Sequence, residues 1–456
     1  MTELGFSVEG KKVTVVGAAR SGIAAARLLV ERGAQVTLSD ARAELPEAQA
    51  LAGIGVALET GGHQPATFTT ADLVVLSPGV PPEQPAVAAA RAHGIPVIGE
   101  VELASRWLRG RIIAITGTKG KSTTTELTGR MLQASGFRVT VGGNIGAPLS
   151  AQVAGSTPDT LHVVETSSFQ LEQIETFHPW IAVMLNFSPD HLDRHPSVAA
   201  YAAAKARIFE NQTIEDWSVV NADDPMVLEL ARRSAARRRL FARETALEDG
   251  TTVSDGWIVS RRDGRTDRLV PLEAIHLLGP HLAVDVMAAA TVGTLAGAAP
   301  AAMTSAVDAF PGLEHAMELV AELGGVRFVN DSKATNVESA VRSIESFASD
   351  LVPIIGGRFK GGDLRLLREP LATRARAVVA IGEARLLIEA SLAGAVDVYQ
   401  ADSLEAAVLR ALELARPAGV VLLAPACASF DMFRDYAERG RRFKEEVARL
   451  IRERRA

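Results

Sequence analysis

The sequence contains very little cysteine and few aromatic residues. Cys427 is the single cysteine among 456 residues, and 5% of the residues are aromatic. One thiol cannot form an internal disulfide or a multi-cysteine zinc site, so a disulfide framework is excluded and the reducing cytoplasm is favoured. The first residues lack the charged and apolar regions of a signal peptide, so none is expected.

Long apolar runs typical of a membrane span are also missing. The longest uncharged stretch, residues 286–307, is rich in Ala and Gly and contains Pro300. We interpret it as a helix buried in protein rather than as a membrane span, because it lacks the bulky apolar side chains that favour lipid.

Basic residues do not predominate, which argues against a nucleic-acid partner. Lys and Arg number 48 against 54 Asp and Glu, for a net charge of −6. A dedicated nucleic-acid binder carries a strong basic field instead. We interpret the arginine-rich segment 232–243 as a solvated helix face rather than a nucleic-acid patch. The remaining composition is that of a globular protein, and the length predicts about three domains.

Apolar segments that alternate with helical patterns predict an α/β protein with mostly parallel sheets. Such sheets bind ligands at the carboxyl ends of their strands. We expect domains at 1–101, 102–312 and 313–456. We expect strands at 12–16, 35–39, 73–76, 95–98, 111–116, 161–164, 326–330, 352–355, 377–381 and 420–423. The chain should end in an amphipathic helix that carries Phe443, Val447, Leu450 and Ile451 on one face.

The strongest motif lies between a predicted strand and a predicted helix. It reads Gly117-Thr-Lys-Gly120-Lys121-Ser122-Thr123. Backbone N–H groups of a glycine loop and a helix N-terminus suit a phosphate, Lys121 adds a positive charge, and Ser122 could ligate Mg²⁺. The spacing departs from the standard phosphate loop because residue 115 is Ile. A tight turn capped by Ser122 is the alternative.

Three further features have both a functional and a structural interpretation. Glu165 follows an apolar strand and could hold Mg²⁺ or cap a helix. The segment 186–195 ends Asp190-His191-Leu-Asp193-Arg-His195 and could bind metal, including zinc, bind substrate, or form a polar loop. Lys205, taken alone, is a solvated helix residue. Gly17–Gly22, with Asp40 after the next strand, could also indicate an NAD site.

Taken together, several segments resemble the Mur ligases, the ATP-dependent amino-acid ligases of peptidoglycan precursor synthesis. The segments are Gly117–Ser122, Gly142-Gly-Asn144-Ile-Gly146, Glu165-Thr-Ser-Ser-Phe-Gln-Leu171, Asp331-Ser-Lys-Ala-Thr-Asn336 and Pro425-Ala-Cys-Ala-Ser-Phe-Asp431. The resemblance covers nearly the whole chain in the family's motif order, and it is greatest to the members that add D-glutamate. It implies a Rossmann-like N-terminal domain, a central ATPase domain of the phosphate-loop type, and a Rossmann-like C-terminal domain.

The resemblance also implies roles for individual residues. UDP-sugar would be bound by Gly17, Arg20, Ser21, Asp40, Arg42, Ser77, Gly79, Asn144 and His191. ATP would be bound by Gly117, Thr118, Lys119, Gly120, Lys121, Ser122, Thr123 and Asp331. The catalytic residues would be Lys121, Glu165, His191, Lys205 and Lys333. Glutamate would be bound by Thr335, Lys360, Ser429 and Phe430.

The implied cofactors are two Mg²⁺ ions, with ATP as co-substrate. The metal ligands would be Ser122, Glu165, His191 and Lys205, the last carrying a carbamate derived from CO₂. Ser429 is expected beside the N-terminus of a helix that begins near Asp431. Cys427 lies in the same loop and is expected to serve packing rather than catalysis.

The implied activity joins glutamate to the L-alanine carboxylate of UDP-MurNAc-L-Ala through an acyl phosphate, in a cytoplasmic monomer without nucleic-acid partners. A sibling ligase with another amino acid and an inactive nucleotide-sugar-binding paralogue are the alternatives. The family commonly has Asn where this chain has Leu282 and Asp285, after the segment Gly279-Pro280-His281, and Arg where it has Ala316. These positions help to hold the nucleotide in the family, so the residues leave open how adenine is recognised. They also leave open which residue is the general base and whether D- or L-glutamate is added.

Overall fold

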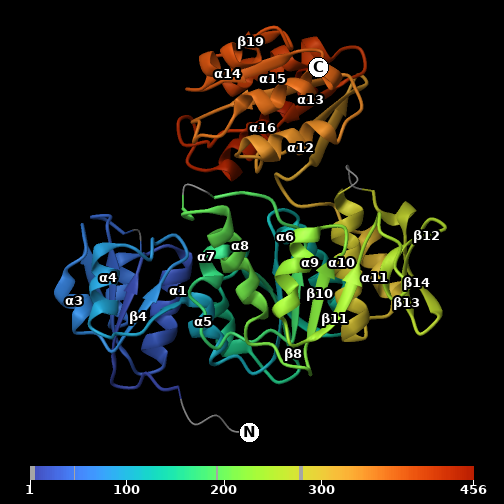
Figure 1. The fold of residues 1–456 in the computed structure, drawn as a ribbon. Helices are drawn as coiled ribbons and strands as arrows, with labels where there is room; N and C mark the ends of the chain where they lie inside the picture. Colours follow the sequence, from blue (N-terminus) through green and yellow to red (C-terminus); the bar gives the residue numbers. More distant parts are fainter. Residues whose placement is uncertain (1–5, 46, 192–193, 277–280, 456) are drawn as a thin grey trace. The chain divides into compact units, whose positions relative to one another are not determined.

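The computed structural model describes residues 6–45, 47–191, 194–276 and 281–455 and contains three sheets (Figure 1). The chain folds into two compact units. The first contains the residues up to Ile275 together with Ala283–Ala309, and it includes two of the sheets. The second contains the third sheet, within Phe310–Ala456. The predicted boundaries at 101/102 and 312/313 remain predictions.

The N-terminal sheet has five parallel strands in the order β3-β2-β1-β4-β5. The strands are β1 (Lys12–Val16), β2 (Gln35–Asp40), β3 (Ala57–Thr60), β4 (Leu73–Leu76) and β5 (Val97–Gly99). The helices are α1 (Arg20–Glu31), α2 (Ala48–Gly53), α3 (Pro65–Thr69), α4 (Pro85–Ala92) and α5 (Glu100–Ser105). α1, α2 and α5 pack on one face and α3 and α4 on the other. Strand order reverses between β1 and β4, which is where such sheets bind ligands.

The central sheet has nine strands in the order β14-β13-β12-β11-β10-β9-β6-β8-β7. β6 to β12 run parallel, and β12, β13 and β14 form an antiparallel extension. The strands are β6 (Arg111–Thr116), β7 (Arg138–Gly143), β8 (Thr160–Glu165), β9 (Ile181–Met184), β10 (Trp217–Asn221), β11 (Arg237–Phe241), β12 (Gly250–Ser254), β13 (Trp257–Arg262) and β14 (Arg265–Pro271). Because β6 lies between β8 and β9, the ends of these three strands meet at one edge.

Helices surround this central sheet. They are α6 (Lys121–Ala134), α7 (Ser168–Leu171), α8 (Val198–Ala206), α9 (Pro225–Leu230), α10 (His281–Ala296) and α11 (Pro300–Asp308). Short 3₁₀ turns are η1 (Leu149–Gly155), η2 (Arg207–Phe209), η3 (Ala231–Arg233) and η4 (Leu272–Ala274). Within the described residues, no helix is long and apolar enough to cross a membrane.

The second unit is a six-stranded sheet in the order β15-β16-β20-β17-β18-β19, with only β15 antiparallel to its neighbour. The strands are β15 (Glu318–Leu323), β16 (Val326–Asn330), β17 (Leu351–Gly356), β18 (Val378–Ile381), β19 (Val398–Gln400) and β20 (Val420–Leu423). The helical segments are α12 (Val337–Glu345), η5 (Leu364–Leu367), α13 (Arg368–Arg374), α14 (Arg385–Leu392), α15 (Leu404–Ala415) and α16 (Tyr436–Arg455). α15 and α16 cover one face, and the others cover the opposite face.

Several predictions of local structure are confirmed, and two are wrong. The strands predicted at 12–16, 73–76, 111–116, 326–330 and 420–423 have the observed bounds, and Phe443, Val447 and Leu450 are buried on one face of α16. Segment 286–307 is not one helix, because α10 ends at Ala296 and Pro300 begins α11. Segment 232–243 is not a solvated helix face, because it contributes β11, where Arg239 is buried against Asp249 and Ser260.

Glu102 links the N-terminal sheet to the central sheet through the connecting helix α5. Its buried carboxylate accepts hydrogen bonds from the backbone N–H groups of Glu175, Thr176 and Phe177, from the Thr176 hydroxyl, and from Arg106. Burial favours the neutral acid, but these donors outweigh it and hold the pKa of Glu102 below its ordinary value. The carboxylate is therefore bound as an anion.

We expect Glu102→Gln to lower the free energy of unfolding at pH 7 by about 1–3 kcal/mol, because the buried donors around this position would lose the anion that accepts their hydrogen bonds. Because the pKa of Glu102 is lower in the folded state than in the unfolded state, its carboxylate stabilises the fold at pH values above the unfolded-state pKa. This stabilisation is lost as the pH falls through the folded-state pKa. The difference between wild type and variant should therefore shrink as pH falls below about 4 in thermal unfolding. The exposed partner variant Glu175→Gln is the control, and a pH-independent difference would contradict this account.

Candidate active site

The phosphate loop lies between β6 and α6, as the sequence predicts. Gly117 and Gly120 adopt φ values of 153° and 80°, which residues other than glycine rarely adopt. A Cβ on Gly117 would also lie 3.0 Å from the Cβ of Leu185. Lys121 begins α6, and its Nζ donates to the carbonyl of Thr118 at 2.9 Å. The loop thus ends on a helix N-terminus with a cation folded over it, the arrangement that an anionic phosphate needs.

Asn186, which follows β9 and begins the candidate segment 186–195, braces this loop, a role that the sequence did not predict. Its Oδ1 accepts the backbone N–H groups of Thr118 and Lys119 at 3.2 and 2.9 Å, and its Nδ2 donates to the Lys119 carbonyl at 3.0 Å. The hydroxyl of Thr118 donates in turn to the Ser188 carbonyl. One amide side chain therefore fixes the loop backbone, which is possible because β9 ends beside β6.

Glu165 ends β8, next to the phosphate loop, and the site brings it together with Asn144. Its Oε1 accepts a hydrogen bond from Asn144 Nδ2 at 2.8 Å. Its Oε2 is buried and has no hydrogen-bond partner among the described residues. A buried carboxylate oxygen without a donor is costly unless a cation or proton compensates it. This oxygen fits the predicted role of Glu165 as a metal ligand.

Lys205, on α8, is buried rather than solvated, so its interpretation from sequence alone was wrong. Its side chain is 2% exposed, and its Nζ donates to the Gly117 carbonyl at 2.6 Å. Burial, followed by repulsion from Lys121, holds the pKa of Lys205 well below its ordinary value. The ring of Tyr201 lies 4.8 Å from the Nζ. Lys205 is thus a buried amine close to the phosphate loop, and its surroundings make the charged form less stable than in water.

His191 is held in a turn that packs around Phe169. It adopts φ 55°, and its carbonyl accepts the N–H groups of Arg194 and His195. The Phe169 ring lies 5.1 Å from the His191 ring and 5.3 Å from that of His195. Asp193, which the sequence placed in the same cluster, lies outside the described residues.

His195 is buried and does not join His191 in a common ligand set. Its Nε2 lies 2.9 Å from Ser168 Oγ, and its Nδ1 lies 3.1 Å from Glu172 Oε1. Among the described residues, no group of three or more His, Cys, Asp or Glu side chains is arranged to hold a metal ion. The His195 contacts anchor the turn to α7, so its role is to position the segment that carries His191.

The residues predicted to bind UDP-sugar cluster where the strand order of the N-terminal sheet reverses. Asp40 accepts hydrogen bonds from the N–H of Ala18 and from the guanidinium of Arg42, which holds the Asp40 pKa well below its ordinary value. The hydroxyl of Ser77 donates to the Gly17 carbonyl at 2.7 Å. These bonds tie the loops after β1, β2 and β4 together.

Two contacts connect this cluster with the central sheet's loops. Arg20 donates to the Gly146 carbonyl at 3.2 Å, and Arg194 donates to the carbonyls of Gly79 and Val80. Ser21 is half-buried at the start of α1. Arg20 and Gly79, two of the positions predicted for the UDP-sugar, therefore adjoin the loop of Asn144 and the segment of His191, respectively.

In the second unit, three loops that carry the remaining predicted residues adjoin one another. Ala426 donates to the Ala334 carbonyl, and Arg358 and Ala428 exchange backbone hydrogen bonds. Lys360 Nζ lies 5.0 Å from the ring of exposed Phe430. The loops 331–336, 356–362 and 425–431 thus bring Thr335, Lys360, Ser429 and Phe430 to one edge of the sheet.

Asp331 and Lys333 belong to the first of these loops. Asp331 accepts hydrogen bonds from the Met317 N–H and the Ser343 hydroxyl, and the Lys333 N–H donates to the His315 carbonyl. Buried Arg439 donates to Ser332 and to the Cys427 carbonyl. Burial raises the pKa of the Cys427 thiol to about 12, which fits a packing role.

Ser429 is not beside a helix N-terminus, so that prediction was wrong. Residues 431–435 form turns, in which the N–H groups of Met432 and Phe433 return to the Ser429 carbonyl, and α16 begins only at Tyr436. Ser429 is buried. The turn satisfies locally the backbone groups that a helix would otherwise use.

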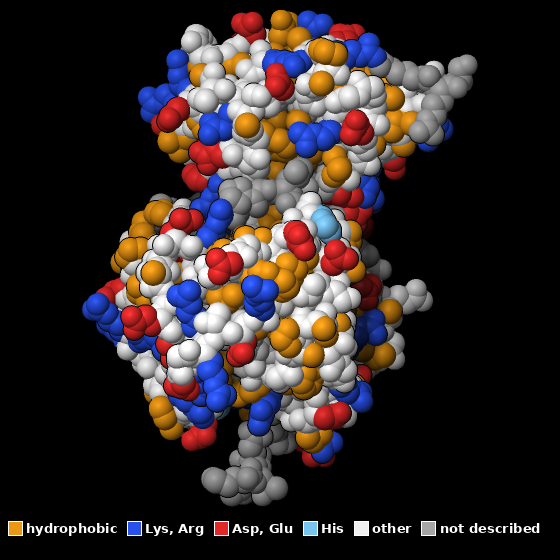
Figure 2. All heavy atoms as spheres, turned by 90° about the vertical axis from the view of Figure 1, so that its right-hand side faces the viewer, with side chains coloured by type: hydrophobic (Ala, Val, Ile, Leu, Met, Phe, Trp, Pro, Cys, Tyr) orange, Lys and Arg blue, Asp and Glu red, His pale blue; other side chains and the backbone are white. Residues whose placement is uncertain are grey.

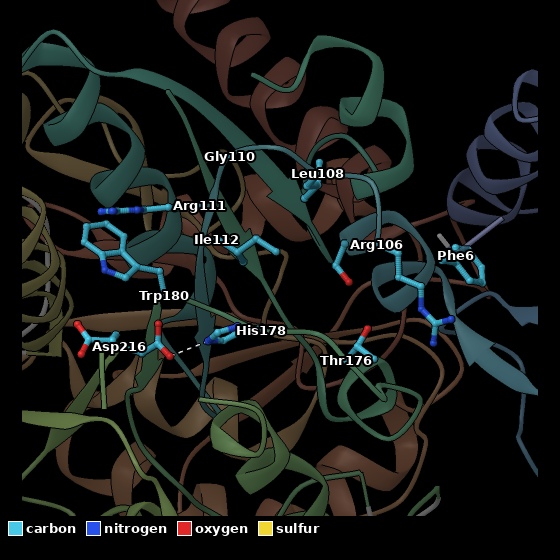
Figure 3. Close-up of a pocket in the computed structure, with 12 residues that line it drawn as sticks. Phe6, Arg106, Leu108, Gly110, Arg111, Ile112, Thr176, His178, Trp180 and Asp216 are labelled. Atoms are coloured by element: carbon cyan, nitrogen blue, oxygen red, sulfur yellow. Dashed lines mark hydrogen bonds and ion pairs between the residues drawn. The ribbon is translucent and has the colours of Figure 1, made fainter. Parts of the chain in front are cut away.

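A separate cavity of about 660 Å³ opens at the opposite end of β6 from the phosphate loop (Figure 3). Arg111 lies over the ring of Trp180 at 4.6 Å, and His178 Nε2 lies 2.6 Å from Asp216 Oδ2. None of the predicted site residues lines this cavity.

Figure 2 shows one face of the molecule, on which acidic and basic side chains are intermixed.

Comparison with known proteins decides the family. Family models match three stretches: the N-terminal domain of the Mur ligase MurD-like type (residues 11–99), the Mur ligase middle domain (115–293) and the Mur ligase glutamate ligase domain (316–427). The chain belongs to the Mur ligase family. It is therefore an ATP-dependent ligase that forms amide bonds, and the NAD alternative for Gly17–Gly22 falls away.

Curated relatives are similar over nearly the whole chain. UDP-N-acetylmuramoylalanine–D-glutamate ligase of Acidobacterium capsulatum is 48% identical over 447 residues, covering 97% of each chain. The ligase of the same name from Geobacter metallireducens is 46% identical, covering 98% of this chain and 99% of the relative.

Solved structures share the fold at low identity. UDP-N-acetylmuramate–alanine ligase from Thermotoga maritima has a TM-score of 0.60 at 19% identity, covering 96% of this chain and 100% of its own. A pseudomurein peptide ligase type C from Methanothermus fervidus has a TM-score of 0.61 at 18% identity, covering 97% and 100%. Both confirm the Mur ligase fold.

We expect Asn186→Ala to reduce kcat/KM for ATP by roughly 10- to 100-fold, because the N–H and the carbonyl of Lys119 lose their side-chain partner and the loop loses its fixed geometry. Steady-state phosphate release at varied ATP measures the effect. Asn211→Ala is the matched control, since the Asn211 amide also binds backbone groups, by donating to the carbonyls of Glu175 and Phe177. Equal losses in the two variants would count against the brace.

Proposed function

We propose that the chain joins D-glutamate to the L-alanine carboxylate of UDP-MurNAc-L-Ala, with conversion of ATP to ADP and phosphate. The observation that carries the proposal is the 43–48% identity, over nearly the full length, to relatives that bear the name of this ligase. The phosphate loop, Glu165 and Lys205 supply a matching site, because all three lie at the carboxyl ends of adjoining central strands or on the helix beside them.

The reaction has two steps. An oxygen of the alanine carboxylate attacks the γ-phosphorus of ATP, and ADP leaves, which gives an acyl phosphate. The glutamate amine then attacks the carbonyl carbon, loses a proton, and phosphate leaves as the amide forms. Negative charge develops on phosphoryl oxygens in the first step, so we assign its stabilisation to Lys121 and the loop N–H groups. The general base for the second step stays unassigned.

We propose that Ser122, Glu165, His191 and a modified Lys205 hold two Mg²⁺ ions with the nucleotide. The unpartnered Oε2 of Glu165 and the serine at the start of α6 are hard oxygen donors of the kind Mg²⁺ prefers. Bound Mg²⁺ would neutralise phosphate charge. Asn144, by donating to Oε1 of Glu165, would keep Oε2 directed toward the cation.

We propose further that Lys205 carries a carbamate. A neutral Nζ attacks the carbon of CO₂, one C–O π bond opens onto oxygen, and the nitrogen loses a proton, which yields an N-carboxylate. Burial supplies the neutral amine by lowering the pKa of Lys205, and the neighbouring Lys121 favours the resulting anion. The group would convert a cation into an oxygen ligand.

We assign UDP-sugar binding to the cluster that includes Gly17, Asp40 and Ser77, and glutamate binding to Thr335, Lys360, Ser429 and Phe430. Lys360 would pair with a glutamate carboxylate, Asp331 would contribute to ATP binding, and Lys333 would be catalytic. We propose a monomer that acts in the cytoplasm, where ATP and nucleotide sugars are available.

The positions of Gly279 and Pro280 lie outside the described residues, while Leu282 is buried in α10.

The purified protein should release phosphate from ATP and Mg²⁺ only when UDP-MurNAc-L-Ala and D-glutamate are both present. A phosphate-release assay with D-glutamate, L-glutamate or neither tests this, with the product's mass confirming one added glutamyl residue. Release with a different amino acid would indicate a sibling ligase. Nucleotide-sugar binding without any turnover would indicate an inactive paralogue and contradict the proposal.

Carbamylation predicts a specific spectroscopic signal. Protein equilibrated with ¹³C-bicarbonate should show one carbamate carbonyl resonance in the ¹³C spectrum that Lys205→Gln lacks. We expect that variant to lose roughly two or more orders of magnitude in kcat while it still binds UDP-MurNAc-L-Ala, because a metal ligand is missing. Lys360→Gln is the control that keeps the resonance. A spectrum without the resonance from an active wild type would refute the modification.

A further inference from the structure

An aspartate from a distant part of the sequence lies against the phosphate loop. Asp285, on α10, is 4% exposed. Its Oδ1 lies 2.1 Å, and its Oδ2 3.1 Å, from the point that a Cβ on Gly120 would occupy. Gly120 is the residue directly before α6. The carboxylate therefore contacts the backbone of the loop at the start of the helix that is expected to receive phosphate.

The carboxylate and a nucleotide phosphate depend on the same electrostatic feature. The first N–H groups of a helix and its dipole stabilise an anion at the N-terminus. Lys121 adds positive charge nearby, since its Nζ folds onto the Thr118 carbonyl. An ionised Asp285 would compensate this charge when no nucleotide is bound, and it would repel the phosphates of a bound ATP.

We propose that Asp285 is an internal counter-anion of the phosphate loop that weakens polyphosphate binding and so determines the nucleotide affinity of this chain. The inference rests on the proposed function, because it takes the loop to be the ATP site. It predicts that the negative charge at position 285, rather than the shape of the side chain, controls affinity.

Charge repulsion has a signature that a packing role lacks. Its strength grows with the charge of the ligand, so it should be absent for adenosine, small for AMP, larger for ADP and largest for ATP. It should also shrink as salt is added. A side chain that merely supports the loop would change all nucleotides by a similar factor at every salt concentration.

The experiment compares wild type with Asp285→Asn, which removes the charge at nearly constant shape. Asp285→Ser is the second variant, because serine is also neutral and is smaller, so it removes the charge with a different side-chain shape. Asp267→Asn is the matched control, since Asp267 lies on the exposed part of β14 and the variant has the same net charge. Dissociation constants for adenosine, AMP, ADP and ATP are measured by calorimetry without Mg²⁺ at low and high salt, and KM for ATP is measured in the ligase assay.

We expect Asp285→Asn to bind ATP roughly three- to tenfold more tightly at low salt, with a smaller gain for ADP, little for AMP and none for adenosine. Asp267→Asn should leave every constant within about twofold, because exposed charges are screened. KM for ATP should fall in parallel with the dissociation constant.

Uniform changes across the nucleotides, unchanged affinities, or weaker ATP binding in the two neutral variants would each overturn the inference. Should Asp285→Asn not fold, Asp285→Ser is judged by the same criteria. Should the wild type ligate D-glutamate but show no charge gradient, the inference alone fails. Should the wild type bind no ATP at all, the proposed function fails and the inference with it.

Discussion

The parallel pairing of β6 between β8 and β9 is the constraint on which the rest of the site depends. Parallel strands end at the same edge of a sheet, so this order places the phosphate loop after β6, Glu165 at the end of β8 and Asn186 after β9 side by side. Hydrogen bonds then connect these elements. Asn186 binds the backbone of the phosphate loop, and Asn144 donates to one oxygen of Glu165. A change of strand order would separate all of these contacts at once.

Buried charge is a second constraint, and the site resolves it in different ways. Asp40 and Glu102 are matched by several donors, which lower their pKa values. Burial and repulsion from Lys121 outweigh the attraction of Asp190 and Glu165 for the Lys205 ammonium, so its charged form is disfavoured. This contrast explains why Asp40 and Glu102 serve as fixed structural anions, whereas Lys205 is suited to chemistry that changes its charge.

The sequence predicted the sheet class and most of the motif positions because these depend on local patterns. Apolar runs bounded by Gly or Ser predicted the strands that carry the motifs, and the family's motifs named Lys121, Glu165 and Lys205. Local patterns could not predict that Asn186 braces the loop or that Asp285 contacts Gly120, because both contacts join residues more than sixty positions apart. The buried state of Lys205 was likewise invisible, since its helix is mostly alanine and gives no amphipathic pattern. Turn 431–435 imitated a helix start because Ser429 and Asp431 are residues typical of caps.

The second unit holds its predicted binding residues on a different kind of support. Arg439 is almost fully buried and joins Ser332 to the Cys427 carbonyl, so one cation fixes two of the three site loops. Burial lowers the Arg439 pKa only to about 10, so the guanidinium remains charged at neutral pH. By contrast, Lys360 and Phe430 are exposed and contact each other. A rigid buried cation beneath exposed side chains lets the loops stay fixed while the residues predicted to bind glutamate remain accessible, an arrangement that suits recognition of a small, charged ligand.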